Sequence, residues 1–156
     1  MKTPIVINPS PTADTRSCDF ANVSRSELIK SSVWHIADVK RGLRYISQLL
    51  MNIGTAHDAD KIEDIYQFHS DFVSGFESTK WWDAHKVKTR HHLQTADGVP
   101  DDVNLLDVLE CVVDCVMAGK ARTGNVTPIT IDDQVLQKAL ANTVNMLMDV
   151  VEVKEM

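Results

Sequence analysis

The chain has 156 residues, 44% of them hydrophobic and 24% charged, a composition typical of a single globular domain. Its net charge of −6 argues against a protein that grips long nucleic acid. No uncharged apolar run is long enough to span a bilayer, and prolines interrupt the N-terminal segment, so we expect neither a signal peptide nor a membrane partner. Three cysteines without a CxxC pair favour a reducing compartment, and we expect a cytoplasmic protein.

Residues 1–24 are rich in Pro, Ser, Thr and Asn, which predicts an extended or disordered lead before one helical domain at 25–156. From Ser26 to Gly54 apolar residues recur every three or four positions, the spacing of an amphipathic helix. Ser24 or Ser26 is the expected cap. His35 falls on the flank of the apolar stripe.

A second helix is predicted from Thr55–Asp58 to Phe76. His57 and Asp58 are about 100° apart around such a helix, so one metal ion at its edge can contact both. Asp58 can alternatively be a carboxylate of the first turn, stabilised by the helix dipole. Lys61, one turn later, is placed to meet a phosphate or a carboxylate, or else to face solvent.

The segment 80–94 has two interpretations. In a straight helix His85 and His92 would be about 10 Å apart, too far to share one ion. The segment is then either irregular, with histidines facing a site, or a basic surface over Trp81 and Trp82.

A further helix is predicted at 102–120, capped by Asp101 or Asp102, with apolar residues nearly all round it. Asp114 lies in this apolar setting, where an unpaired charge is costly, so a metal or a basic side chain must neutralise it. Lys120 and Arg122 follow about two turns later and can bind a phosphate or complement the helix C-terminus. A last helix at 132–151 has a second apolar face, which suggests a homo-oligomer.

Histidine nitrogens and carboxylates are ligands of Mn, Co, Ni, Fe, Zn or Mg. We expect one metal ion, held by His35, His57, Asp58 and Asp114. A site with two ions is the alternative.

The order of these four ligands, together with the stretch HDADK, resembles the HD superfamily of metal-dependent phosphohydrolases. The stretches WWDAHKVKTRHH and CVVDCVMAGKARTGN are more narrowly similar to small HD-like proteins of bacteria and phages. The resemblance covers roughly residues 30 to 125. It implies an all-α, HD-like bundle of about five to six helices, and it implies that one or two of the histidines at 85, 91 and 92 face the substrate or a second metal.

The expected function is hydrolysis of a nucleotide, with a (deoxy)nucleoside 5′-monophosphate as the favoured substrate, by water that the metal activates. Asp58, Lys61, His85 and His92 are the expected catalytic residues. The expected substrate-binding residues are Lys61, His85, His91, His92, Lys120 and Arg122.

Two other functions stay open. The set His35, His57, Asp58, His85, His92 and Asp114 resembles in order the ligands of HD-fold oxygenases with two irons. The third possibility is a helical oligomer that binds metal or nucleotide without turnover.

Overall fold

The computed structural model describes residues 4–9, 22–126 and 128–155. Within them it contains six α-helices, one 3-10 helix and two short strands, which confirms the predicted all-α class. None of the described helices combines the length and the apolar character that a membrane span requires. The chain divides into two units, residues 1–49 with 145–156 and residues 50–144.

Helix α1 (Arg25–Ala56) begins and continues much as its periodicity predicts. Ser24 caps it: the hydroxyl of Ser24 accepts from the backbone N–H of Glu27 at 3.2 Å, and the Glu27 carboxylate accepts from the Ser24 N–H at 3.0 Å. The predicted stop at Gly54 is two residues early, because the helix runs through this glycine to Ala56.

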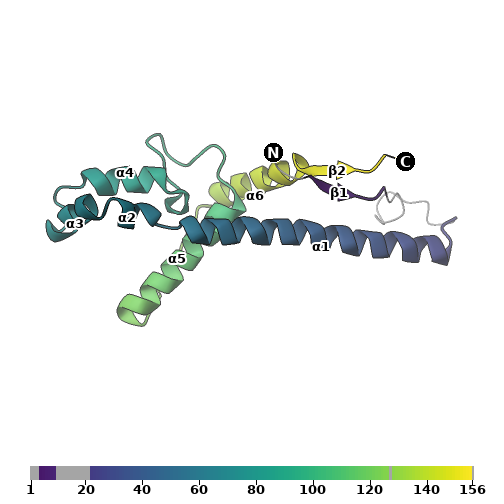
Figure 1. The fold of residues 1–156 in the computed structure, drawn as a ribbon, viewed down its shortest axis with the longest axis horizontal. Helices are drawn as coiled ribbons and strands as arrows, with labels where there is room; N and C mark the ends of the chain where they lie inside the picture. Colours follow the sequence, from purple (N-terminus) through teal and green to yellow (C-terminus); the bar gives the residue numbers. More distant parts are fainter. Residues whose placement is uncertain (1–3, 10–21, 127, 156) are drawn as a thin grey trace. The chain divides into compact units, whose positions relative to one another are not determined.

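In the first unit β1 (Ile5–Ile7) and β2 (Val151–Val153) pair in parallel, as Figure 1 shows. Neither strand was predicted. The last helix, α6 (Asp133–Met148), therefore ends three residues before the predicted Val151, which instead opens β2. Part of the lead predicted at 1–24 forms the strand Ile5–Ile7. Residues 10–21 of this predicted lead lie outside the described residues.

In the second unit, the single helix predicted from Thr55–Asp58 to Phe76 is wrong. The structure has two helices there, α2 (Ala59–Glu63) and α3 (Ile65–Val73), with Asp64 between them. Helix α4 (Lys80–Lys88) follows and lies beside α3 (Figure 1). The buried carboxylate of Asp71 on α3 accepts from the backbone N–H groups of Trp81 and Trp82, each at 3.0 Å, and so caps α4 from a neighbouring helix.

A short 3-10 helix, η1 (Arg90–His92), comes after α4, and α5 (Leu105–Thr123) packs against it. The cap of α5 is Asn104, not Asp101 or Asp102. The Asn104 side chain accepts from the N–H of Leu106 at 2.9 Å, and Asp107 accepts from the Asn104 N–H at 2.9 Å.

The core of the second unit joins the start of α5 to α6. Val103, Val108 and Ala139 form its buried centre. The hydroxyl of Thr143 on α6 accepts from the N–H of Leu105 at 2.8 Å, a further fixed point for the start of α5. This anchoring holds the helix that carries Glu110 and Asp114.

Candidate metal centre

Asp58 occupies the turn between α1 and α2 with a backbone φ of 53°, in the left-handed region that non-glycine residues rarely adopt. Its side chain makes no capping hydrogen bond to α2, so the simple capping role considered from the sequence does not describe it. The Asp58 carboxylate faces His85 and His91 with its Oδ1 atom.

Two histidines present the same ring nitrogen to Asp58. The Nε2 atoms of His85 and His91 lie 3.4 and 3.6 Å from Asp58 Oδ1. All three atoms are buried and have no hydrogen-bond partner among the described residues. Buried polar atoms are normally paired, so this group requires either a proton or a cation between its members.

Carboxylates hold the opposite nitrogens of these rings. The Nδ1–H of His85 donates to Asp60 at 3.0 Å, and His91 Nδ1 lies 3.3 Å from Glu110. An imidazole that donates through Nδ1 keeps its lone pair on Nε2. This is the arrangement by which outer carboxylates orient histidine ligands of a metal.

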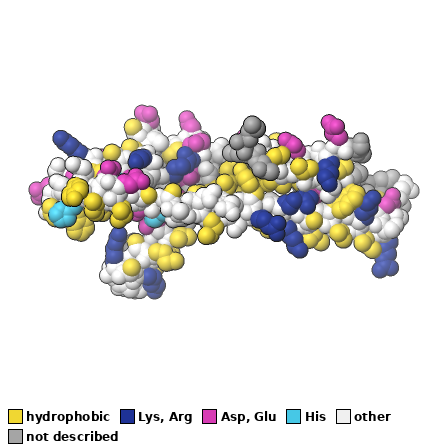
Figure 2. Space-filling model, viewed as in Figure 1, with side chains coloured by type: hydrophobic (Ala, Val, Ile, Leu, Met, Phe, Trp, Pro, Cys, Tyr) yellow, Lys and Arg dark blue, Asp and Glu magenta, His cyan; other side chains and the backbone are white. Residues whose placement is uncertain are grey.

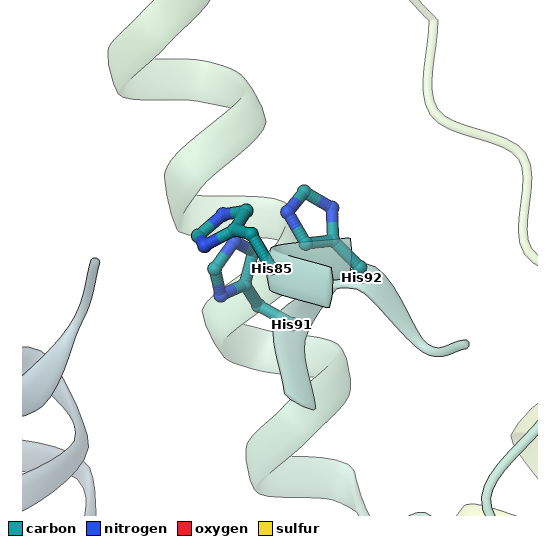
Figure 3. Close-up of side chains that lie close together, drawn as sticks. All are labelled: His85, His91 and His92. Atoms are coloured by element: carbon teal, nitrogen blue, oxygen red, sulfur yellow. The ribbon is translucent and has the colours of Figure 1, made fainter. Parts of the chain in front are cut away.

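The third histidine joins the other two where the backbone turns. Figure 3 shows the rings of His85, His91 and His92 converging, the first from α4 and the others from η1. Each of the three offers a nitrogen within 4.8 Å of the others. Thr89 is extended, with φ −91° and ψ 123°, and ends α4. The chain turn removes the separation of about 10 Å that a straight helix would impose.

A second group of ligand atoms adjoins the first. His57 Nε2 lies 3.4 Å from Asp58 Oδ2 and 3.6 Å from Asp114 Oδ1, while its Nδ1–H donates to Glu110 at 2.9 Å. These side chains are more open than the buried His85, with 27% of His57 and 32% of Asp114 exposed. Asp114 is thus not the fully buried carboxylate that its apolar sequence context predicted.

The acid–base properties differ between the two groups. Burial lowers the pKa of His91 despite the carboxylates near it, and burial together with His91 and His85 lowers the pKa of His92 to about 4. At neutral pH both rings are therefore uncharged and able to coordinate. Burial by itself would lower the pKa of His57. The hydrogen bond to Glu110 and the charges of Asp58, Asp114 and Glu110 have the larger combined effect, so the pKa of His57 is raised. A proton on His57 is the metal-free means of neutralising its carboxylates.

Of the two contacts predicted for Lys61, with a phosphate or with a carboxylate, the structure shows the second. Lys61 forms an ion pair with Asp58 Oδ2. Burial raises the pKa of Asp58, yet the hydrogen bond and charge of Lys61 prevail and hold it below its ordinary value. Lys120 donates to the carbonyl of Gly124 at 3.0 Å, the helix-terminal role.

Three cavities of the second unit adjoin the ligands. One of about 430 Å³ contains His57, Asp58 and His91 in its wall, together with Lys88. A second, of about 420 Å³, is mostly apolar and reaches His57 and Asp114. The third, of about 410 Å³, is lined by Asp114 and Arg122. A small molecule can therefore approach the ligand atoms from the open side of the centre.

His35 belongs to the first unit. The other three predicted ligands, His57, Asp58 and Asp114, belong to the second unit. The four groups of potential ligands found in the described part of the chain do not include His35. Its role as a ligand stays a prediction.

Two residues of the site were missed in the sequence, Asp60 and Glu110. A weak signal for Glu110 was present, since it precedes Asp114 by four residues and so shares its helical face. Asp60 had no such signal, because its contact with His85 depends on how α2 and α4 pack.

Comparisons of the chain with protein-family models, with curated proteins and with solved structures find no match.

Proposed function

We propose that the second unit binds one or two divalent metal ions, with Asp58 as the ligand common to both positions. The observation that carries the proposal is the set of buried, unpaired atoms Asp58 Oδ1, His85 Nε2 and His91 Nε2. The two lone-pair nitrogens and the carboxylate oxygen face one another at 3.4 and 3.6 Å. Without a cation or a proton between them these atoms repel, whereas a metal ion satisfies all three.

The donor set supports a transition metal. Imidazole nitrogens suit Mn, Fe, Co, Ni or Zn, and the carboxylates also admit Mg. One position would be held by Asp58 with His85 and His91, and His92, which groups with these two histidines, would complete it. The other would be held by His57, Asp58 and Asp114. The second position has only three protein ligands and is partly exposed, so water and substrate would have room to bind there.

The reaction that we propose is the hydrolysis of a phosphate ester. A divalent ion in this site lowers the pKa of a bound water to near neutrality, which supplies a nucleophile. Glu110 and Asp60 keep the histidine rings in the coordinating tautomer. The ion pair with Lys61 keeps Asp58 ionised. The histidines expected to be catalytic, at 85 and 92, would then act as ligands.

A nucleotide, with a nucleoside 5′-monophosphate favoured, is the proposed substrate. Lys88 and Arg122 line two of the cavities and have no ion-pair partner among the described residues, so either can meet a phosphate group. The apolar cavity beside His57 and Asp114 has space for an uncharged base or sugar face. The resemblance of HDADK and its companion histidines to the HD superfamily supports the same reaction.

One observation favours a second candidate, an oxygenase with two irons. Asp58 lies between the two positions, with Oδ1 facing His85 and His91 and Oδ2 3.4 Å from His57, as a carboxylate that bridges a dinuclear centre would. Oxygen chemistry requires iron in both positions and a change of oxidation state, whereas hydrolysis proceeds with redox-inactive ions. The identity and number of the bound ions separate these candidates.

The test begins with chelator-treated protein to which Mn, Co, Ni, Mg or Fe(II) is returned, followed by phosphate release from nucleoside mono-, di- and triphosphates. Metal-dependent release from one substrate class, lost in His85→Gln and retained in His69→Gln, supports the hydrolase. The histidine at 69 is a matched control because it is exposed on α3. Metal binding without release in any combination contradicts hydrolysis, and oxygen uptake with two irons per chain then favours the oxygenase.

A further inference from the structure

The short helix η1, which supplies two of the three converging histidines, is tied to α5 by its first residue. Arg90 donates from Nε and Nη2 to the two carboxylate oxygens of Asp107, both at 2.7 Å. Arg90 also reaches Asp102, with Nη2 3.1 Å from its carbonyl oxygen. A guanidinium held by two parallel hydrogen bonds has a defined orientation as well as a position.

The partner of Arg90 is itself immobilised. Asp107 is 2% exposed and also accepts from the N–H of Asn104 in the cap of α5. Arg90 is therefore held by a carboxylate that is itself buried and fixed at the start of α5.

The remaining bonds of η1 are local. The N–H of Leu93 donates to Arg90, and that of His92 donates to Thr89. Such bonds shape the turn, but they do not determine where the turn lies on α5. A further contact of η1 with α5, His91 with Glu110, involves a ring that the site itself needs in place.

We propose that Arg90 is a positioning residue of the metal centre, which fixes η1 on α5 so that His91 Nε2 faces Asp58 and His92 lies within ligand distance of His85 and His91. This inference rests on the proposed function, because it concerns the same centre. It assigns to Arg90 a role in setting metal affinity and geometry, not in contact with a substrate phosphate, since Asp107 and Asp102 already occupy its guanidinium.

The test compares Arg90→Met and Arg90→Lys with the wild type by titration with Co(II), whose visible absorption reports the number and type of its ligands. We expect Arg90→Met to bind Co(II) about 10–100-fold more weakly, the loss typical of outer-shell partners, and with a changed spectrum. Lysine keeps the charge but not the two-pronged contact, so Arg90→Lys should fall between them. Lys138→Met, which removes an exposed ion pair with Asp101 in the adjoining loop, should behave as the wild type. Unchanged affinity and spectrum in Arg90→Met overturn the proposal.

A second measurement does not depend on metal. In chelated protein, diethylpyrocarbonate should modify the peptide with His91 and His92 faster in Arg90→Met than in the wild type, because His91 is only 3% exposed in the anchored arrangement. Equal rates in folded proteins refute the anchoring role. If the wild type binds no Co(II) but the labelling rates differ as expected, the proposed function fails, whereas the anchoring of η1 on α5 by Arg90 stands.

Discussion

Asp60 and His85 form a buried pair in which the Nδ1–H of the histidine donates to the carboxylate at 3.0 Å. The pair determines which nitrogen of His85 carries the lone pair. It directs that lone pair at Asp58 Oδ1, 3.4 Å away, where no proton donor is available among the described residues. A carboxylate that orients an imidazole toward a second carboxylate prepares a cation site.

Replacement of His85 by Gln should remove a ligand from the buried side of the centre. We expect a loss of affinity for Co(II) or Mn(II) greater than the roughly 10–100-fold seen for outer-shell changes. Isothermal titration of the chelated protein measures it. His69→Gln should leave the affinity unchanged, and similar losses in both variants would contradict the ligand assignment.

Replacement of Asp60 by Asn should weaken the binding of the same metal ion indirectly. The amide is a poorer acceptor for the Nδ1–H of His85 and leaves the ring free to change tautomer, so we expect about 10–100-fold weaker binding. Asp83→Asn is the control, because Asp83 is an exposed residue of α4 that pairs with Lys86. A metal affinity equal to that of the wild type would show that Asp60 has no orienting role.

Acid should destabilise the metal-free protein through His92. Its pKa is lowered from 6.5 to about 4 in the fold, chiefly by burial. As the pH falls from 6.5 toward 4, the unfolded chain binds a proton at His92 that the folded protein does not, so the free energy of unfolding decreases across this window.

Urea denaturation of chelated protein at several pH values measures this effect. His92→Gln should flatten the decline over that window, because the unfolded chain then has one fewer site to protonate. An identical pH dependence in the variant and the wild type would contradict the lowered pKa.

Gly119 and Gly42 should respond in opposite ways to alanine. A Cβ at Gly119 would lie 2.6 Å from the backbone carbonyl oxygen of Asn125, so the following segment must shift, at a cost of about 1–3 kcal/mol. Gly42 is inside α1 with nothing within 4 Å of an added Cβ, and alanine there should stabilise by about 0.5–1 kcal/mol. Chemical denaturation measures both changes, and a stabilised Gly119→Ala would refute the close approach.

Helix α1 was predictable because its determinants are local. The helix and its Ser24 cap appear as expected. The apolar stripe was expected to be buried, but Val33, Ile36 and Leu43 are 59%, 55% and 64% exposed. The break at Asp64 was not predictable, since the aromatic residues that follow keep a helical period through it. The break accompanies contacts from another helix: Trp81 donates to Asp64 at 3.4 Å, and its ring packs on Phe68.

The exposed part of α5 shows a similar limit of prediction from sequence. Its apolar residues predicted a central helix with a buried Asp114. Leu109, Val113 and Met117 are 45%, 54% and 65% exposed, and hydrophobic side chains are visible on this helix in Figure 2. Hydrophobic periodicity reports that a face is apolar, but not whether another element covers it.

The all-α class and the place of α1 could be predicted from the sequence, because they depend on residues close together in the chain. The prediction that put His57 and Asp58 on a helix was wrong, since both lie in the turn between α1 and α2. Only the tertiary structure decided that His85, His91 and His92 converge, through the extended Thr89, and that Asp60 and Glu110 orient them. Distances between side chains far apart in sequence depend on how helices pack. No local pattern encodes that packing.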